Sequence, residues 1–338
     1  NYFTKHIAGL TVAAFATFGL ASQAKAVEVQ EVVSDGGIRA WLIEDHLNPL
    51  MTMDIAFTGA GAATDADGKL GLSNMVSGLI DEGAGEMDSQ TFRGEMENRS
   101  ISLSFDAGRD DFAGSLVTLT HERDTAIDLL RLALSEPRFD DEAIERIRAQ
   151  IVSGLKSAEN DPGDIASRTF FKSIFGDHPY ARPVSGNFDT VASLNANDFR
   201  GFVRHAFAKD NLIIGVAGDI TADELGPLLD EAFGSLPDHA DLPAIADVTP
   251  TFGAIDVVKQ DIPQSQAIWG QKGIKRTDPD FYAAYVMNYI LGGGGFSSRL
   301  TEEVREKRGL AYGVYSYLAD LDHAEMMMGG VATRNDAI

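Results

Sequence analysis

Residues 305–312 read Arg305-Glu306-Lys307-Arg308-Gly309-Leu310-Ala311-Tyr312, and this segment joins a helical pattern to a strand pattern. The spacing of residues 300–307 predicts a helix, and Gly309 is suited to the left-handed conformation that ends one. Residues 310–318 then alternate as a strand. We therefore expect Arg305 and Tyr312, seven residues apart, to converge on one point from a helix end and a strand start.

The sequence before and after residue 250 has the same order of elements. Strands are predicted at 38–44 and 51–58, followed by a helix at 70–80, and then again at 254–259 and 266–271, followed by a helix at 279–291. The offset of roughly 210 residues indicates a duplicated α+β domain. Further helices are predicted at 90–98, 125–135, 141–160, 165–175, 197–207 and 222–233, and further strands at 101–105, 115–120 and 212–217.

The domain boundaries follow from this order and from a stretch rich in Pro, Asp and Ala between residues 236 and 250. A first domain is predicted at 27–240, a linker at 241–252 and a second, incomplete domain at 253–338. The final residues, 333–338, read like the beginning of a helix, and the chain starts with Asn. We therefore expect both ends of the protein to extend further.

Composition excludes several classes of protein. The chain has 338 residues, with 28 Lys and Arg against 51 Asp and Glu, and a net charge of −23. Its apolar and charged fractions are those of a globular protein, and its acidity argues against nucleic acid or anionic lipid as a partner. The chain contains no cysteine. Disulfides, Cys-ligated zinc, iron–sulfur clusters and a catalytic thiol are therefore excluded.

The first 26 residues have the pattern of a secretory signal peptide. Lys5 precedes an apolar run at 7–20, and Ala24-Lys25-Ala26 is a small-residue cleavage site. A short membrane anchor is the weaker alternative, because the run is shorter than the roughly 20 residues that a spanning helix needs. We expect cleavage after Ala26, a periplasmic or secreted protein, and no stable membrane insertion after cleavage.

Several motifs together resemble one family. They are Asp67-Gly68-Lys69-Leu70-Gly71-Leu72 leading to Asp81-Glu82-Gly83-Ala84, His178-Pro179-Tyr180, and 292–300 leading into 305–312. From about residue 30 onward the chain resembles the insulinase/pitrilysin (inverzincin) family of zinc metallopeptidases, most closely the bacterial branch related to mitochondrial processing peptidase. The resemblance implies an α+β fold of two similar domains, each an antiparallel-rich sheet with helices packed on one face. It also implies two chains that enclose a chamber for unfolded peptides.

The zinc motif of that family, H-x-x-E-H on a helix of the first domain, is degenerate here. Asn74 stands at the first histidine, Ser77 at the general base and Gly78 at the second histidine. The third ligand, a glutamate about 76 residues further on, corresponds to Gly154. Catalytic zinc needs three protein ligands with nitrogen, sulfur or carboxylate donors. No catalytic residue and no metal ligand are therefore predicted in this chain alone.

The chain offers no replacement for these ligands. No two of its histidines stand four residues apart, and each is expected on the surface or in a loop rather than on a metal: His6, His46, His121, His178, His205, His239 and His323. The second signature that the resemblance implies is an Arg and a Tyr that hydrogen-bond the substrate near the scissile carbonyl, and Arg305 and Tyr312 match it. The alternative is structural, with Arg305 paired to Glu302 or Glu306 and Tyr312 an ordinary strand residue.

Three hypotheses follow. In the first, this chain is the non-catalytic, substrate-binding subunit of a heterodimeric periplasmic zinc peptidase. It contributes Arg305 and Tyr312 in trans, while a homologous H-x-x-E-H subunit supplies the zinc and the base, and the complex acts on unfolded peptide. In the second it is an inactive binding or assembly scaffold of the same fold. In the third it is a self-sufficient metallopeptidase, which the missing ligands count against.

Overall fold

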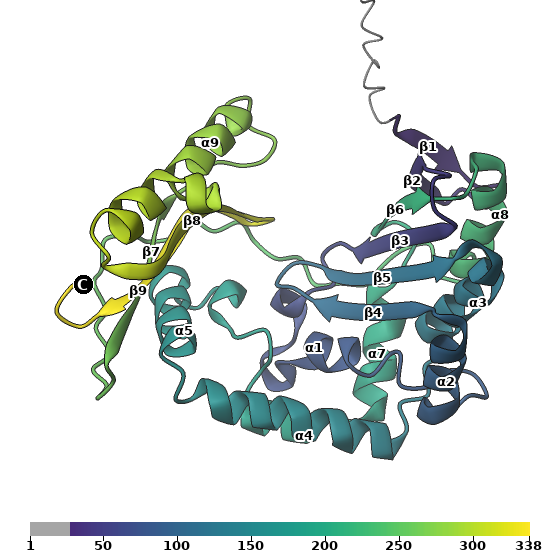
Figure 1. Cartoon of the computed structure of the whole chain (residues 1–338). Coiled ribbons are helices and arrows are strands. Elements are labelled where there is room, and N and C mark those ends of the chain that lie inside the picture. The colour runs from purple at the N-terminus through teal and green to yellow at the C-terminus, as the bar shows by residue number, and fades with distance from the viewer. Residues whose placement is uncertain (1–27) are drawn as a thin grey trace, which may run out of the picture.

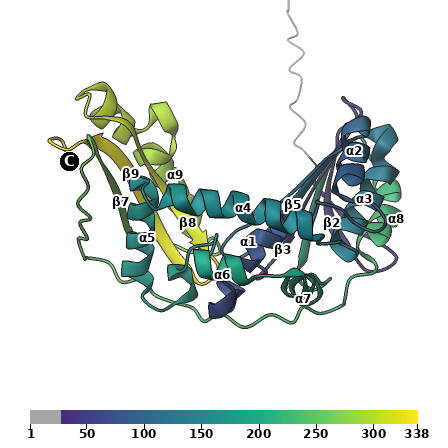
Figure 2. The same cartoon turned by 90° about the horizontal axis from the view of Figure 1, so that it is seen from below.

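The computed structural model describes residues 28–338, and the signal peptide predicted at 1–26 lies outside the described residues. Figures 1 and 2 show two lobes connected by a long helix, α4 (Asp141–Ala158). The larger lobe contains a mixed sheet of six strands and the smaller lobe a sheet of three strands. None of the described helices combines the length and the apolar character needed to cross a bilayer.

The six-stranded sheet has the strand order β1-β2-β6-β3-β5-β4. The parallel pair is β2 with β6, and the other neighbours are antiparallel. Buried residues alternate with partly buried or exposed ones along β5 and β6, so only one face of this sheet enters the core. The strands are β1 (Gln30–Val33), β2 (Arg39–Glu44), β3 (Leu50–Phe57), β4 (Ser102–Ala107), β5 (Phe112–Leu119) and β6 (Leu212–Gly218).

Helices cover the core face of this sheet, with α3 against β5, α8 against β1 and α1 against β4. The centre of the core is aromatic, and the rings of Phe57 and Phe207 stack with their centroids 4.3 Å apart. The opposite face of the sheet looks toward the second lobe (Figure 2). The helices of the larger lobe other than α4 are α1 (Leu72–Ser77), α2 (Ser89–Arg99), α3 (Arg123–Ser135), α6 (Phe188–Ser193), α7 (Ala196–Ala206) and α8 (Ala222–Phe233).

The smaller lobe has the strand order β7-β9-β8, from β7 (Gln264–Lys272), β8 (Ala311–Leu321) and β9 (Ala324–Arg334). Both pairs are antiparallel, as in β3-β5-β4 of the first sheet, so the sequence repeat has a counterpart in strand topology. Helix α5 (Pro162–Phe175) packs on one face through Phe170 and Phe175 against Met326 and Met328. Helix α9 (Phe281–Asn288) contacts β8.

The two lobes meet at two hairpin tips joined by Tyr180. The Tyr180 hydroxyl donates to Asp110 Oδ1 at 2.5 Å, in the turn between β4 and β5. It also accepts the backbone N–H of His323 at 3.0 Å, in the turn between β8 and β9. Tyr180 is fully buried, and burial raises the pKa of its hydroxyl. The His178-Pro179-Tyr180 motif therefore has a structural function, because the hydroxyl of Tyr180 links the two lobes by hydrogen bonds.

Several sequence predictions are corrected. The strand predicted at 254–259 does not form. The corresponding segment of the larger lobe is β2, which is paired with both β1 and β6. Among residues 28–338 no strand stands beside 254–259 in the way that β6 stands beside β2. Thr333 and Arg334 end β9 instead of starting a helix, and the helix predicted at 70–80 ends at Ser77. The helix predicted at 279–291 ends at Asn288 and continues as a π-helical turn to Gly293.

Candidate functional site

The degenerate zinc helix α1 is fixed at its start by a buried carboxylate. Gly71, at φ +88°, is the N-cap residue, in a left-handed conformation that favours glycine. The side chain of Asp65 accepts from the backbone N–H of Gly71 at 2.9 Å and of Ser73 at 3.2 Å. Burial raises the pKa of Asp65 to about 6 despite these bonds. The start of the helix is thus held by a carboxyl group whose pKa is well above that of an ordinary aspartate.

The side chains on α1 are arranged for packing. Ser77 is buried, and its hydroxyl donates to the backbone carbonyl of Asn74 at 2.9 Å. Gly78 lies just past the helix, and a Cβ atom placed there would meet Ile147 Cγ2 of α4 at 3.2 Å. The volume that a second histidine would need is therefore partly filled by an isoleucine.

Gly154 lies on α4, where a Cβ atom would meet nothing within 4 Å. The four motif positions thus supply an amide, an engaged hydroxyl and two glycines, and this set does not fit a catalytic zinc ion. Among residues 28–338 no group of three or more His, Asp and Glu side chains is arranged to hold a metal. No catalytic step can be assigned to zinc bound by this chain.

A charged cluster follows α1 and ties it to α2 and α4. The carboxylate of Glu82, which is 2% exposed, is contacted by Ser89, Arg93 and Arg146, with Arg146 Nη1 at 2.8 Å. Burial opposes ionisation, but the hydrogen bonds and charges of these partners lower the pKa of Glu82 below its usual value. Because the acid is fully satisfied, this cluster stabilises the fold and offers no free base.

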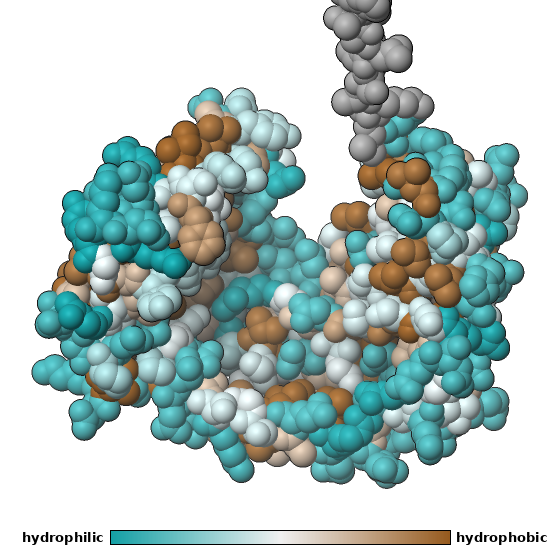
Figure 3. Space-filling view, viewed as in Figure 1, coloured by the Kyte–Doolittle hydropathy of each residue, from teal (hydrophilic) through white to brown (hydrophobic). Residues whose placement is uncertain are grey.

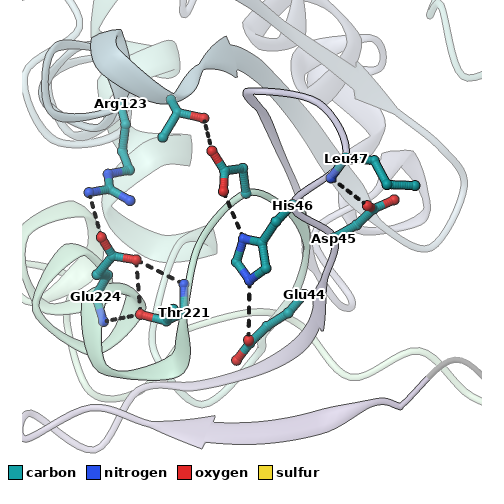
Figure 4. A network of polar contacts seen from close by, with 9 residues as sticks. Glu44, Asp45, His46, Leu47, Arg123, Thr221 and Glu224 are labelled. Atoms are coloured by element: carbon teal, nitrogen blue, oxygen red, sulfur yellow. Dashed lines mark hydrogen bonds and ion pairs between the residues drawn. The ribbon is translucent and has the colours of Figure 1, made fainter.

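None of the histidines among residues 28–338 belongs to a group of three or more potential metal ligands. His46 contacts two carboxylates, since its Nδ1 lies 2.7 Å from Asp219 Oδ1 and its Nε2 lies 3.6 Å from Glu44 Oε2 (Figure 4). Hydrogen bonding to Asp219 is the main cause that raises the pKa of His46. Thr120 donates to the other oxygen of Asp219 at 3.0 Å. This network joins the turn after β2 to the end of β6.

Arg305 and Tyr312 are brought together. Arg305 lies in a π-helical turn, Thr301–Glu306, and Gly309 follows at φ +60° as predicted. The backbone N–H of Gly309 donates to the carbonyl of Arg305 at 2.9 Å, which closes the turn. The guanidinium carbon of Arg305 then lies 5.7 Å from the centroid of the Tyr312 ring.

A β-bulge directs Tyr312 outward. In the pairing of β8 with β9, Ala311 is opposite Thr333 and Gly313 is opposite Ala332, so Tyr312 is the extra residue. Bulges turn the affected side chain away from its regular direction, and Tyr312 is 89% exposed. The hydroxyl is therefore presented to solvent instead of being packed on the sheet.

Phe296 is a contributor that the sequence reasoning missed. Phe296 lies on a short helical turn that begins at Gly295, the last of four consecutive glycines, and its ring centroid is 4.8 Å from the guanidinium carbon of Arg305. Arg305 also pairs with Glu306 at 3.3 Å, as the structural alternative expected. The sequence signal that could have identified Phe296 is its position directly after a run of four glycines.

Comparison with known proteins agrees with this picture. Residues 193–336 match the family model described as the peptidase M16 inactive domain. A crystal structure of a peptidase M16 inactive domain from Pseudomonas fluorescens is 28% identical, with a TM-score of 0.84, over 91% of this chain and 75% of that one. The chain belongs to the M16 (pitrilysin/insulinase) family.

Two curated relatives differ in what their names state. A protein of Helicobacter pylori named a non-peptidase homolog is 29% identical over 87% of this chain and 67% of its own length. An uncharacterized zinc protease of Streptomyces coelicolor is 36% identical over 57% of this chain and 43% of its own length. This M16 chain thus spans between about two fifths and two thirds of these two relatives. In this chain the four motif positions are Asn74, Ser77, Gly78 and Gly154.

Proposed function

We propose that this chain is the non-catalytic, substrate-binding subunit of a heterodimeric M16 peptidase. A homologous partner with an intact H-x-x-E-H motif would supply the zinc and the general base. This chain would supply Arg305 and Tyr312 to the peptide held in the shared active site. The observation that carries the proposal is the bulged, 89% exposed Tyr312 beside Arg305, in a chain whose zinc positions have no ligands.

The chemistry of the pair suits this function. A peptide carbonyl gains negative charge as water attacks it, and preorganised hydrogen-bond donors lower the energy of that state. Arg305 offers a permanently charged, planar donor, and Tyr312 offers a neutral hydroxyl. A scaffold that binds no peptide has no chemical need for a bulge that presents a tyrosine hydroxyl to solvent.

The test uses the complex with the H-x-x-E-H partner and a short peptide substrate. Tyr312→Phe removes only the hydroxyl and should lower kcat by roughly 10²–10³, as the loss of one oxyanion donor typically does. Arg305→Ala should be at least as damaging. Tyr282→Phe, which alters a 78% exposed tyrosine on α9, serves as the control and should leave kcat unchanged.

The outcomes separate the hypotheses. A fall in kcat with unchanged affinity between subunits supports contact in the transition state, whereas a rise in KM alone indicates simple substrate holding. If the heterodimer forms and both variants keep the kcat/KM of the unmodified complex, the scaffold hypothesis replaces this proposal.

We also infer that the complex works in the periplasm or outside the cell, because residues 1–26 have the pattern of a cleavable signal peptide. Mass spectrometry of the exported protein should then give a mature chain that begins near Val27. An uncleaved segment, or protein retained in the cytoplasm, would contradict this inference.

A further inference from the structure

The open face of the six-stranded sheet carries an exposed tryptophan. Trp41 lies on β2 between Ala40 and Leu42, which are both buried, and it is itself 53% exposed. Strand alternation places Trp41 on the face opposite the helices, the face that looks toward the second lobe. Figure 3 shows a hollow between the lobes, with hydrophobic residues on the larger lobe beside it.

Strand register places three partners in one row with Trp41. Glu31 of β1 is opposite Trp41, Trp41 is opposite Gly215 of β6, and Gly215 is opposite Asp54 of β3. Residues opposite each other in neighbouring strands share a face. Trp41 and Asp54 are therefore two strand spacings apart, about 9–10 Å, with Gly215 between them.

The space above Gly215 is open. A Cβ atom placed on Gly215 would meet nothing within 4 Å, so neither the indole of Trp41 nor the carboxylate of Asp54 fills it. The hydroxyl of Ser115 donates to Asp54 Oδ1 at 2.7 Å and orients that carboxylate. We call this open position above Gly215, with Trp41 on one neighbouring strand and Asp54 on the other, the notch.

The charges on this face are mostly acidic. The charged residues that the six strands present there are Glu31, Arg39, Asp54 and Asp106. Arg39 Nη1 pairs with Glu31 at 2.7 Å, which leaves the carboxylates of Asp54 and Asp106 without a basic neighbour on the same face. A cation is attracted both by the face of an indole ring and by a carboxylate.

We propose that this notch, bounded by Trp41 and Asp54 above Gly215, binds a lysine or arginine side chain of an unfolded peptide. The stem of such a side chain packs on the indole while its charged end reaches Asp54. The proposal rests on the proposed function in so far as the occupant is a peptide. It adds to that function a preference for basic residues at a position separate from Arg305 and Tyr312.

The test uses the purified chain without a partner. The probe is a fluorescein-labelled, unstructured 20-residue peptide that contains three lysines, and its twin has glutamine at those three positions. Fluorescence anisotropy gives the ratio of the two Kd values at low salt. We expect the lysine peptide to bind more tightly, and Trp41→Ala to reduce the ratio by roughly two- to fivefold.

Two further variants test the notch without removing an aromatic residue. Gly215→Val fills the floor with a side chain that suits a strand, so it should abolish the lysine preference while keeping the thermal midpoint. Asp54→Asn should weaken the preference. Asp124→Asn makes the same change of charge on α3, at a side chain that is 88% exposed, and should leave the ratio unchanged.

The proposal is overturned if the two peptides bind equally to the unmodified chain, or if Gly215→Val and Asp54→Asn both leave the ratio unchanged. These outcomes are independent of the active-site proposal. If the unmodified chain shows no lysine preference while Arg305 and Tyr312 variants strongly reduce kcat of the complex, the notch alone is rejected. A retained preference without those effects would reject the trans-acting pair alone.

Discussion

The guanidinium of Arg305 lies within cation–π distance of two aromatic rings, with its carbon 4.8 Å from the centroid of Phe296 and 5.7 Å from that of Tyr312. A flexible exposed arginine loses conformational entropy when it is held in one place. Contact with two rings offsets part of this cost, because cation–π attraction favours the held position. Phe296 is thus a positioning residue for Arg305.

Phe296→Ala should therefore weaken the function of Arg305 without removing a donor. Loss of one exposed cation–π contact, about 0.5–1 kcal/mol, predicts a two- to fivefold fall in kcat of the complex with the H-x-x-E-H partner. Arg305→Ala should mask this effect, so that the double variant is no slower than Arg305→Ala. An additive loss in the double variant would show that Phe296 acts independently of Arg305. Tyr282→Ala, at another exposed ring, is the matched control.

The sequence was informative about this region wherever the structure depends on local chemistry. The glycine cap at Gly309 and the strand that follows were predicted correctly, since each depends on a few adjacent residues. The direction of Tyr312 was not predictable, because the bulge exists only in the register between β8 and β9. The contact of Phe296 with Arg305 likewise depends on how a glycine-rich turn folds back.

The limits of prediction are also clear at the sheets. Residues 254–259 have the composition of a strand, but a strand needs a neighbour, and neighbours are not local information. Residues 38–44 were predicted as a strand and form β2. The exposure of Trp41 on that strand depends on which face the helices cover, which sequence alternation alone does not give.

Restoring the zinc motif should not restore a zinc site. The unmodified chain should retain no stoichiometric zinc, because its motif positions offer no ligand set. The variant Asn74→His/Ser77→Glu/Gly78→His/Gly154→Glu should still hold well below one zinc per chain after dialysis. The reason is steric, since the side chain at position 78 would be forced against Ile147.

Adding Ile147→Ala to that variant should raise the zinc content, at a cost in stability of about 2–5 kcal/mol for the lost packing. Elemental analysis of the dialysed proteins gives the zinc ratio, and urea unfolding gives the stability. Full zinc occupancy in the variant that retains Ile147 would show that α1 adapts and that steric exclusion is not the obstacle.

Asp65 should make the protein less stable as pH rises from about 4 to about 6. Burial raises its pKa in the folded chain to about 6 from the ordinary value of 3.8, so the folded state holds a proton that the unfolded state releases in this window. The contribution of Asp65 to the free energy of unfolding is therefore fully present below its pKa in the unfolded chain. It is lost as the pH rises through its pKa in the folded chain. The difference of about 2 units corresponds to about 3 kcal/mol.

Asp65→Asn keeps an acceptor for the N–H groups of Gly71 and Ser73 but cannot ionise. The variant should therefore lose about 2 kcal/mol less than the unmodified chain between pH 4 and pH 7, because part of the effect already lies below pH 4. Urea unfolding at a series of pH values measures this slope. Equal slopes for the two proteins would mean that Asp65 is not the titrating group. Asp67→Asn, two residues away at a 96% exposed side chain, controls for the charge change.

Tyr180→Phe should loosen the attachment of the two lobes while leaving each core packed. The substitution removes the hydroxyl that donates to Asp110 and accepts from His323, and keeps the ring in its buried position. Hydrogen bonds to charged groups contribute about 1.5–3 kcal/mol, so a loss of stability in that range is expected.

The connecting segment 241–263, which contains no helix or strand, should become more sensitive to limited proteolysis in Tyr180→Phe. Tyr285→Phe, on the exposed face of α9, should change neither property. Unchanged proteolysis and stability in Tyr180→Phe would mean that other contacts between the lobes, such as that of the Arg109 guanidinium in the β4–β5 turn with the Phe171 ring of α5, hold the lobes together without this hydroxyl.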